Sequence, residues 1–265
     1  MSLVAGAALA APVFSSELTD LSEFDAGEAQ VVILGEVHDN PAHHAAQAEL
    51  VARMAPGAVV FEMLSPEQAR TVVDLGADSG VEALSEALGW DRSGWPHFAM
   101  YHPILVAAGD AAIYGAALPR DRVRAAVTDG AAEIFGEGYE RFGLGDPLPD
   151  AEQATREAGQ MSAHCDALPE GILPGMVAAQ RLRDAHFARV TLDALGETGG
   201  PVAVITGNGH ARTDWGIPAA IARAAPQVEV LSFGQLEAPP EPPVPFDLWR
   251  VTAAPEREDP CTAFR

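Results

Sequence analysis

The sequence contains no lysine, because all 16 of its basic residues are arginine. This absence excludes a Schiff-base lysine, a Walker-type phosphate loop and lysine-dependent acylation chemistry. Acidic residues outnumber basic ones by 38 to 16, which gives a formal net charge of −22. Nucleic acids and anionic lipid surfaces are bound mainly through clustered lysine and arginine. We therefore expect no nucleic-acid partner for this protein.

Long hydrophobic runs are also absent. No stretch of 18 or more apolar residues occurs, so the sequence predicts no membrane-spanning helix. Residues 4–13 are small and apolar like the end of a signal peptide, although no basic segment precedes them. They favour an exported protein, and the alternative is a frayed alanine-rich terminus.

Short apolar runs alternate with helical patterns, which is typical of an α/β fold with a mainly parallel sheet. The runs predict about five strands, at residues 31–34, 58–63, 111–118, 203–206 and 228–233. A capping residue followed by proline predicts helices that begin at Pro41 and Pro66. We expect residues 1–265 to form a single α/β domain.

Two segments depart from this alternation. Residues 120–200 contain no strand-like run and predict a helical insertion. Residues 237–265 predict an extended C-terminal segment, because 237–246 are rich in proline and acidic residues, and DLWRVT after them predicts an edge strand.

Cysteine is scarce, with only Cys165 and Cys261. Two cysteines are too few for a disulfide scaffold or a four-thiolate metal site. An oxidising compartment allows one disulfide, which would fix the acidic tail across the helical insertion. We predict this disulfide, and the alternative is two unrelated buried thiols.

Polar residues follow three of the predicted strands. The first strand runs into Gly35-Glu36-Val37-His38-Asp39, the second ends in Glu62, and the fourth runs into Gly207-Asn208-Gly209-His210. Ligands of open parallel sheets bind beyond the carboxyl ends of the strands. Two imidazoles and a carboxylate suit a divalent first-row metal, so we predict a metal site at His38, Glu62 and His210. The alternative is that each histidine only fixes a loop by hydrogen bonding.

Several nearby residues have two interpretations. Glu36 is either a general base or a cap for the helix that follows Asn40. His43 and His44 lie on the first turn of that helix, and we expect them to line the rim or to face solvent. Further along the chain, Met176, Gln180 and Asp184 share one helical face. This face either packs on the sheet, or Gln180, Arg181 and Asp184 support the crevice histidines.

Two common enzyme motifs are missing. Gly207-Asn208-Gly209 begins a dinucleotide-binding fingerprint, but its sixth position is Arg212 instead of glycine. No G-x-S-x-G nucleophile elbow occurs either. The sequence thus favours neither a nicotinamide enzyme nor a serine hydrolase.

Four segments together resemble the ChaN-like family of haem-binding uptake proteins. They are LGEVHDNPAHH, the FEM strand end, AHC with LPGMVAAQRLRDAHFA, and ITGNGHARTDWGIP, and the resemblance spans roughly residues 25–233. The family is grouped with Tiki and TraB proteins, which share paired G-x-x-H motifs and a strand-end glutamate. The resemblance implies a three-layer α/β/α domain. It also implies a protein of iron uptake that is exported and is either periplasmic or attached to the membrane by a lipid anchor.

The resemblance further implies that haem binds at the subunit interface of a homodimer. Tyrosine or histidine is the expected axial ligand. The candidates are Tyr101 and His102, which follow an aromatic stretch, and Tyr139 and His164 in the insertion. We expect haem at a surface or interface, because the sheet crevice is lined with charge.

Two functions therefore compete. The leading one is haem binding in bacterial iron or haem uptake. The alternative is a metal-dependent hydrolase, similar to the Tiki proteases or to an esterase, whose metal is held by His38, Glu62 and His210. There the metal would lower the pKa of a bound water, and Glu36 would accept its proton. Whether the protein is an enzyme stays open, as does a binding module with a relic site.

Overall fold

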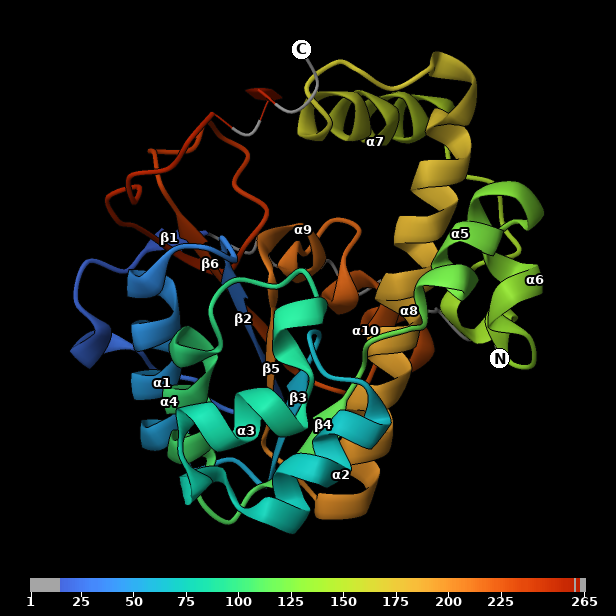
Figure 1. Ribbon diagram of the computed structural model, residues 1–265. Helices are drawn as coiled ribbons and strands as arrows, with labels where there is room; N and C mark the ends of the chain where they lie inside the picture. The colour runs from blue at the N-terminus through green and yellow to red at the C-terminus, as the bar shows by residue number, and fades with distance from the viewer. Residues whose placement is uncertain (1–14, 260, 263–265) are drawn as a thin grey trace, which may run out of the picture.

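The computed structural model describes residues 15–259, 261 and 262, and within them seven strands form one sheet, with every neighbouring pair parallel. The strand order is β1-β7-β6-β2-β5-β3-β4 (Figure 1). The strands are β1 (Ser16–Glu17), β2 (Val31–Glu36), β3 (Ala58–Phe61), β4 (Ala112–Gly115), β5 (Val202–Gly207), β6 (Val230–Leu236) and β7 (Leu248–Val251). The segment interpreted as an export signal, residues 4–13, lies outside the described residues.

The predicted α/β class is confirmed, and all five predicted strands are present. The sheet is larger than expected because of β7 and the two-residue strand β1. We expected β7 at the edge, but β1 pairs with its outer side. A two-residue strand has no sequence pattern of its own, which explains why β1 was missed.

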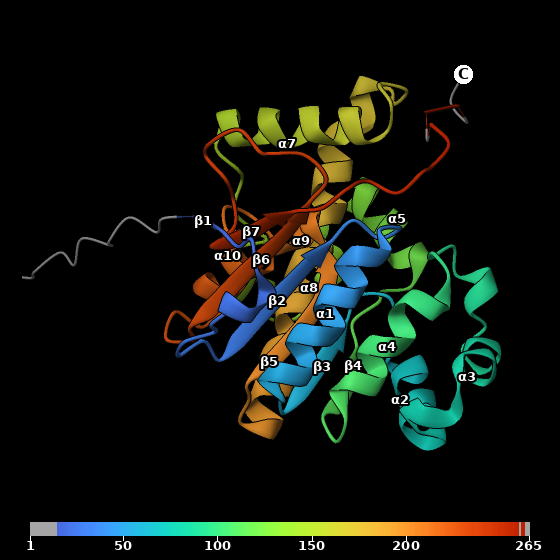
Figure 2. The same ribbon diagram turned by 90° about the vertical axis from the view of Figure 1, so that its left-hand side faces the viewer.

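Helices cover both faces of the sheet, which gives the three layers visible in Figure 2. Alternate residues of each central strand point to opposite faces. Val32 and Leu34 of β2 lie in one core with α1 and α4, whereas Val31 and Ile33 lie in the other with α5, α8 and α10. The helices are α1 (Pro41–Met54), α2 (Pro66–Leu75), α3 (Val81–Ala87), α4 (Phe98–Ala108), α5 (Arg120–Asp129), α6 (Ala131–Phe135), α7 (Asp150–Ala163), α8 (Leu173–Thr198), α9 (Asn208–Ala211) and α10 (Ile217–Ala224).

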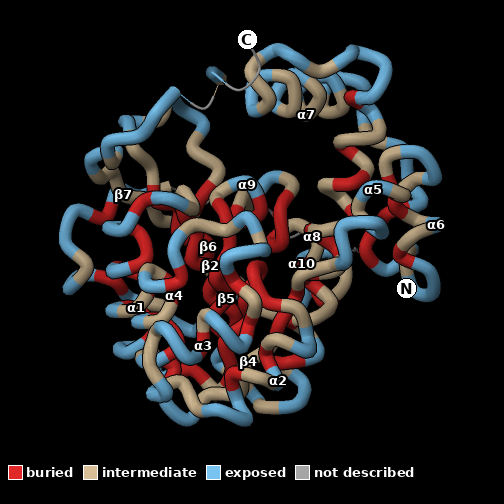
Figure 3. The backbone as a smooth tube through the Cα atoms, in the orientation of Figure 1, coloured by how far each residue is buried: buried red, intermediate tan, exposed pale blue. Residues whose placement is uncertain are grey.

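The central strands are completely buried. Every residue of β2, β3 and β5 is buried, as the red core of Figure 3 shows. Strands covered on both faces have continuous apolar sequences, as these do. The polar residues at their carboxyl ends are therefore held on a rigid support.

Local signals set where the first helices begin. The Asn40 side chain accepts a hydrogen bond from the Ala42 amide, and Pro41 occupies the first helical position. Ser65 and Gln68 form a reciprocal capping box at the start of α2. Both helices thus begin within a few residues of a strand end.

Residues 120–200 are helical, as predicted, and contain α5, α6, α7 and α8. The 26-residue helix α8 is longer than the strands on which it packs, and its first turns project past the carboxyl edge of the sheet (Figure 1). We call α7 and these first turns, residues 150–180, the helical arm. The arm stands over the polar strand ends.

The C-terminal segment joins the sheet to the helical arm. The predicted disulfide is confirmed, since Cys165 at the end of α7 is bonded to Cys261. Between β7 and this disulfide, Arg257 forms ion pairs with Asp39 and Glu237. In the described part of the chain, none of the helices combines the length and apolar character required to cross a bilayer.

We expect the disulfide to stabilise the fold mainly by restricting the unfolded chain. The two cysteines are 96 residues apart, and the chain-entropy relation gives an upper figure of about 4–5 kcal/mol for such a loop. Cys261→Ser should lower the free energy of unfolding in denaturant titrations, and reductant should lower that of the wild type but not that of the variant. Two titratable thiols in denatured, unreduced wild type would contradict the pairing.

Candidate functional site

The candidate site lies where three adjacent strands end. Strand β5 lies between β2 and β3, and Glu36 at the end of β2 is in register with Gly207 at the end of β5. Glu62 directly follows β3, and His210 lies on the short helix α9 after β5. Parallel pairing thus brings His38, Glu62 and His210 to one edge of the sheet, where all three line the same cavity.

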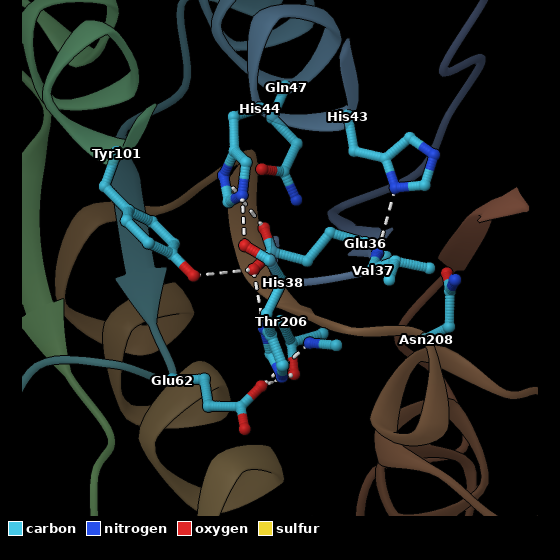
Figure 4. Close-up of polar contacts among 12 residues, drawn as sticks. Glu36, Val37, His38, His43, His44, Gln47, Glu62, Tyr101, Thr206 and Asn208 are labelled. Atoms are coloured by element: carbon cyan, nitrogen blue, oxygen red, sulfur yellow. Dashed lines mark hydrogen bonds and ion pairs between the residues drawn. The ribbon is translucent and has the colours of Figure 1, made fainter. Parts of the chain in front are cut away.

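Glu36 is buried, and one of its carboxylate oxygens has two hydrogen-bond partners. Its Oε1 atom is 2.7 Å from Nδ1 of His38 and accepts a hydrogen bond from the Tyr101 hydroxyl at 3.1 Å (Figure 4). Nδ1 of His44 lies 3.4 Å from Oε2. Glu36 does not cap α1, because Asn40 does. Its carboxylate instead orients His38.

His43 and His44 are completely buried, which corrects the expectation that they line the rim. The Val37 amide donates to Nδ1 of His43 at 2.9 Å, and Nε2 lies 2.8 Å from the Thr252 hydroxyl. Nε2 of His44 donates to the backbone carbonyl of His38. The first turn of α1 is covered by the C-terminal segment, a distant contact that helical periodicity cannot reveal.

Glu62 has partners on both carboxylate oxygens. Oε2 accepts hydrogen bonds from the Thr206 hydroxyl at 2.7 Å and the Gly207 amide at 2.8 Å. Oε1 forms an ion pair with Arg183 and lies 3.6 Å from Nε2 of His210. Burial opposes the charged form, but His210 and Arg183 outweigh it and lower the pKa of Glu62 to about 2. Glu62 is therefore ionised at neutral pH.

His210 is oriented from helix α8. Its Nδ1 atom is 2.5 Å from Oδ1 of the buried Asp184 and 3.1 Å from the side-chain nitrogen of Gln180. Gln180 and Asp184 therefore contact the crevice histidine His210, as one of the two interpretations of the sequence expected. Arg181 is different, because it donates to the carbonyls of Gly143 and Asp146 instead.

Sequence reasoning missed Arg183. The signal was present, because residues 180, 183 and 187 recur at helical spacing on one face, whereas 181 lies about 100° away from 180 around the axis. Arg183 contacts Glu62. Phe187 packs edge-on against His210, with 4.9 Å between the two ring centres.

His38 is the most accessible of the predicted metal ligands, with 35% of its side chain exposed. Burial lowers its pKa, but the hydrogen bond with Glu36 and the charges of Glu62 and Glu36 act more strongly, so the pKa is raised. Its ring packs edge-on against Trp95, with 4.9 Å between the two ring centres.

The four candidate haem ligands are not brought together. Tyr101 is 1% exposed and bonded to Glu36, and Nε2 of His102 lies 3.0 Å from the Ala77 carbonyl. Tyr139 begins the short 3₁₀ helix η4 (Tyr139–Phe142). His164, at the end of α7, lines the same cavity as His38, and the other three do not.

This cavity has a volume of about 620 Å³ and lies between the strand ends and the helical arm. Three arginines line it, namely Arg156, Arg183 and Arg212. The guanidinium of Arg212 lies 3.8 Å from the ring centre of Trp215, and that of Arg156 lies 5.0 Å from it. Because Arg183 is paired with Glu62, an anionic ligand would meet mainly Arg156 and Arg212.

The predicted metal ligands share the cavity but do not close around one point. Among residues 15–259, 261 and 262, no group of three or more histidine, cysteine or acidic side chains has an arrangement that can hold a metal ion. At this edge, both oxygens of Glu62 are engaged by protein donors.

The sequence matches the family described as haem-binding uptake, Tiki superfamily, ChaN, over residues 25–221. The chain belongs to this family. The fold is similar to a solved structure of ChaN of Campylobacter jejuni, described as showing cofacial haem binding. The two are 19% identical with a TM-score of 0.61, over 81% of this chain and 84% of that one.

A weaker similarity is to the type III effector HopBA1, with 9% identity and a TM-score of 0.46, over 85% of this chain and 88% of that one. A succinoglycan biosynthesis protein gives 13% identity and a TM-score of 0.44, over 79% of this chain and 66% of that one. No curated protein matches the sequence.

Burial of neutral His43 should make the protein acid-sensitive. Burial lowers the pKa of His43 to about 4, whereas an unfolded histidine titrates near pH 6.5. The unfolded state therefore takes up this proton first, and up to about 3 kcal/mol of stability is lost as pH falls from about 6.5 to 4.

His43→Gln should remove part of this loss in denaturant titrations between pH 7 and pH 4. Part of it should remain, because burial also lowers the pKa of His186 to about 4. The matched control is His97→Gln, which changes an exposed histidine and should leave the pH profile as in the wild type. Equal profiles for His43→Gln and the wild type would refute the assignment.

Proposed function

We propose that the protein binds haem as part of bacterial haem or iron uptake, with haem as its cargo. The observation that carries the proposal is the family match over residues 25–221. The similarity to a ChaN structure described by its haem binding agrees with it.

We place the haem in the cavity under the helical arm, which differs from the surface site expected from the sequence. Nδ1 of His164 donates to the Gln160 carbonyl at 2.8 Å, so Nε2 is the ring nitrogen left to act as a ligand. Arg156 and Arg212, which pack on the Trp215 ring, offer partners for propionate carboxylates. We propose His164 as the axial ligand contributed by this chain.

The tyrosine candidates are less suited, because a tyrosine ligand binds iron as phenolate. Burial and the adjacent Glu36 raise the pKa of Tyr101, and the adjacent Glu140 raises the pKa of Tyr139. The imidazole of His102 is fixed by the Ala77 carbonyl, outside the cavity.

The proposal includes a homodimer and an exported protein, periplasmic or membrane-anchored. The Cys165–Cys261 disulfide supports the export, because structural disulfides persist in oxidising compartments. The metal-dependent hydrolase gains no support from the residues, since both oxygens of Glu62 already have protein partners.

Haem titration followed by the Soret band tests the proposal. The wild type should bind, and His164→Ala should weaken binding at least about tenfold, as loss of a ligand does. Arg156→Ala with Arg212→Ala should weaken binding without the spectral change that accompanies loss of an axial ligand. Gel filtration with and without haem would measure the dimer.

The matched control is His97→Ala, because His97 is exposed and does not line the cavity. It should bind haem like the wild type, as should Tyr101→Phe with His102→Ala. A wild type that binds no haem defeats the function. A wild type that binds haem but is insensitive to His164→Ala defeats only the ligand assignment.

A further inference from the structure

We propose that Arg183 occupies the cation position of a histidine–carboxylate site formed by His38, Glu62 and His210. The native protein then binds no divalent metal at this position, and a transition metal binds once the guanidinium is removed. This inference does not depend on the haem proposal.

The first support is the orientation of the two histidines. Nδ1 of His38 is 2.7 Å from Glu36, and Nδ1 of His210 is 2.5 Å from Asp184. Histidines that bind metals typically donate one ring N–H to a carboxylate, which leaves the other nitrogen for the metal. Both rings have this arrangement.

The second support is the spacing of the opposing atoms. Two ligands at 2.0–2.2 Å from a tetrahedral metal lie about 3.3–3.6 Å apart, and Nε2 of His210 lies 3.6 Å from Oε1 of Glu62. His38 lies close to the Gly207 backbone at the same edge. A Cβ atom built on Gly207 would lie 2.8 Å from Nε2 of His38, and the Gly207 amide donates to Glu62.

The third support is what Arg183 does at this position. Its guanidinium forms an ion pair with Oε1 of Glu62, the same oxygen that faces His210. It also lies over the Phe187 ring, 5.4 Å from the ring centre. A guanidinium is always protonated, so it supplies the permanent positive charge that a buried carboxylate requires.

This arrangement makes metal binding unfavourable in the native protein. An incoming divalent ion must displace Arg183 from Glu62, and the released guanidinium would leave its charge beside the ion in the same cavity. Removing only the charged group frees Oε1 of Glu62 and leaves both histidines oriented by their carboxylates. The proposal requires side-chain rotations that bring His38 to the pair formed by Glu62 and His210, which already lie 3.6 Å apart.

The test is titration with Co²⁺, followed by its visible absorption, and with Zn²⁺, followed by calorimetry. Arg183→Met keeps an unbranched apolar stem beside Phe187 and should bind either ion at least about a hundredfold more tightly than the wild type. Arg183→Met with Glu62→Gln should lose this gain. Arg181→Met is the matched control, because Arg181 is the neighbouring arginine on α8 and does not contact Glu62.

A wild type that binds Co²⁺ as tightly as Arg183→Met would overturn the proposal, as would a folded Arg183→Met protein that binds neither ion. Removing Arg183 leaves Glu62 buried without its ion pair, so the variant can also lose stability. In that case Zn²⁺ should raise its melting temperature or restore its folding, since a ligand that binds only the folded state stabilises it. Failure of Zn²⁺ to do so would equally overturn the proposal.

Discussion

Two carboxylates are buried at one edge of the sheet, Glu36 at the end of β2 and Glu62 directly after β3. The surrounding side chains compensate their charge. A buried carboxylate requires donors or opposite charge, because removal from water strongly disfavours its ionised form. Glu36 is hydrogen-bonded to Tyr101 and His38. Glu62 forms an ion pair with Arg183 and accepts a hydrogen bond from Thr206. These donors come from α4, α8 and the strand ends, so the requirement ties both layers of helices to one edge of the sheet.

The sequence was sufficient for the fold class because each central strand is a continuous apolar run that ends in polar residues. Parallel pairing then placed His38, Glu62 and His210 at one edge without any knowledge of contacts. Distant contacts were not predictable in this way. The burial of His43 depends on Thr252, which is 209 residues away in the sequence. The ion pair of Glu62 depends on Arg183, which is 121 residues away.

The helical arm explains why the polar edge forms a cavity instead of an open surface. Helix α8 packs its later turns on the sheet and projects its first turns beyond it, so α7 is held above the strand ends. The disulfide fixes the far end of α7 to the C-terminal segment, which also contacts Asp39 beside His38. The family match ends at residue 221, so the C-terminal side of these contacts, Arg257 and Cys261, lies outside the matched region.

The charges divide the cavity into two regions. At the sheet edge, Arg183 is paired with Glu62, so its charge is already balanced. Arg212 and Arg156 lie near Trp215, and their acidic partners are Asp214 and Glu152. The Asp214 pair is partly exposed, and such pairs contribute little and exchange readily with other anions. An anionic ligand in this cavity would therefore meet Arg212 beside Trp215, whereas at the sheet edge Arg183 stays paired with Glu62.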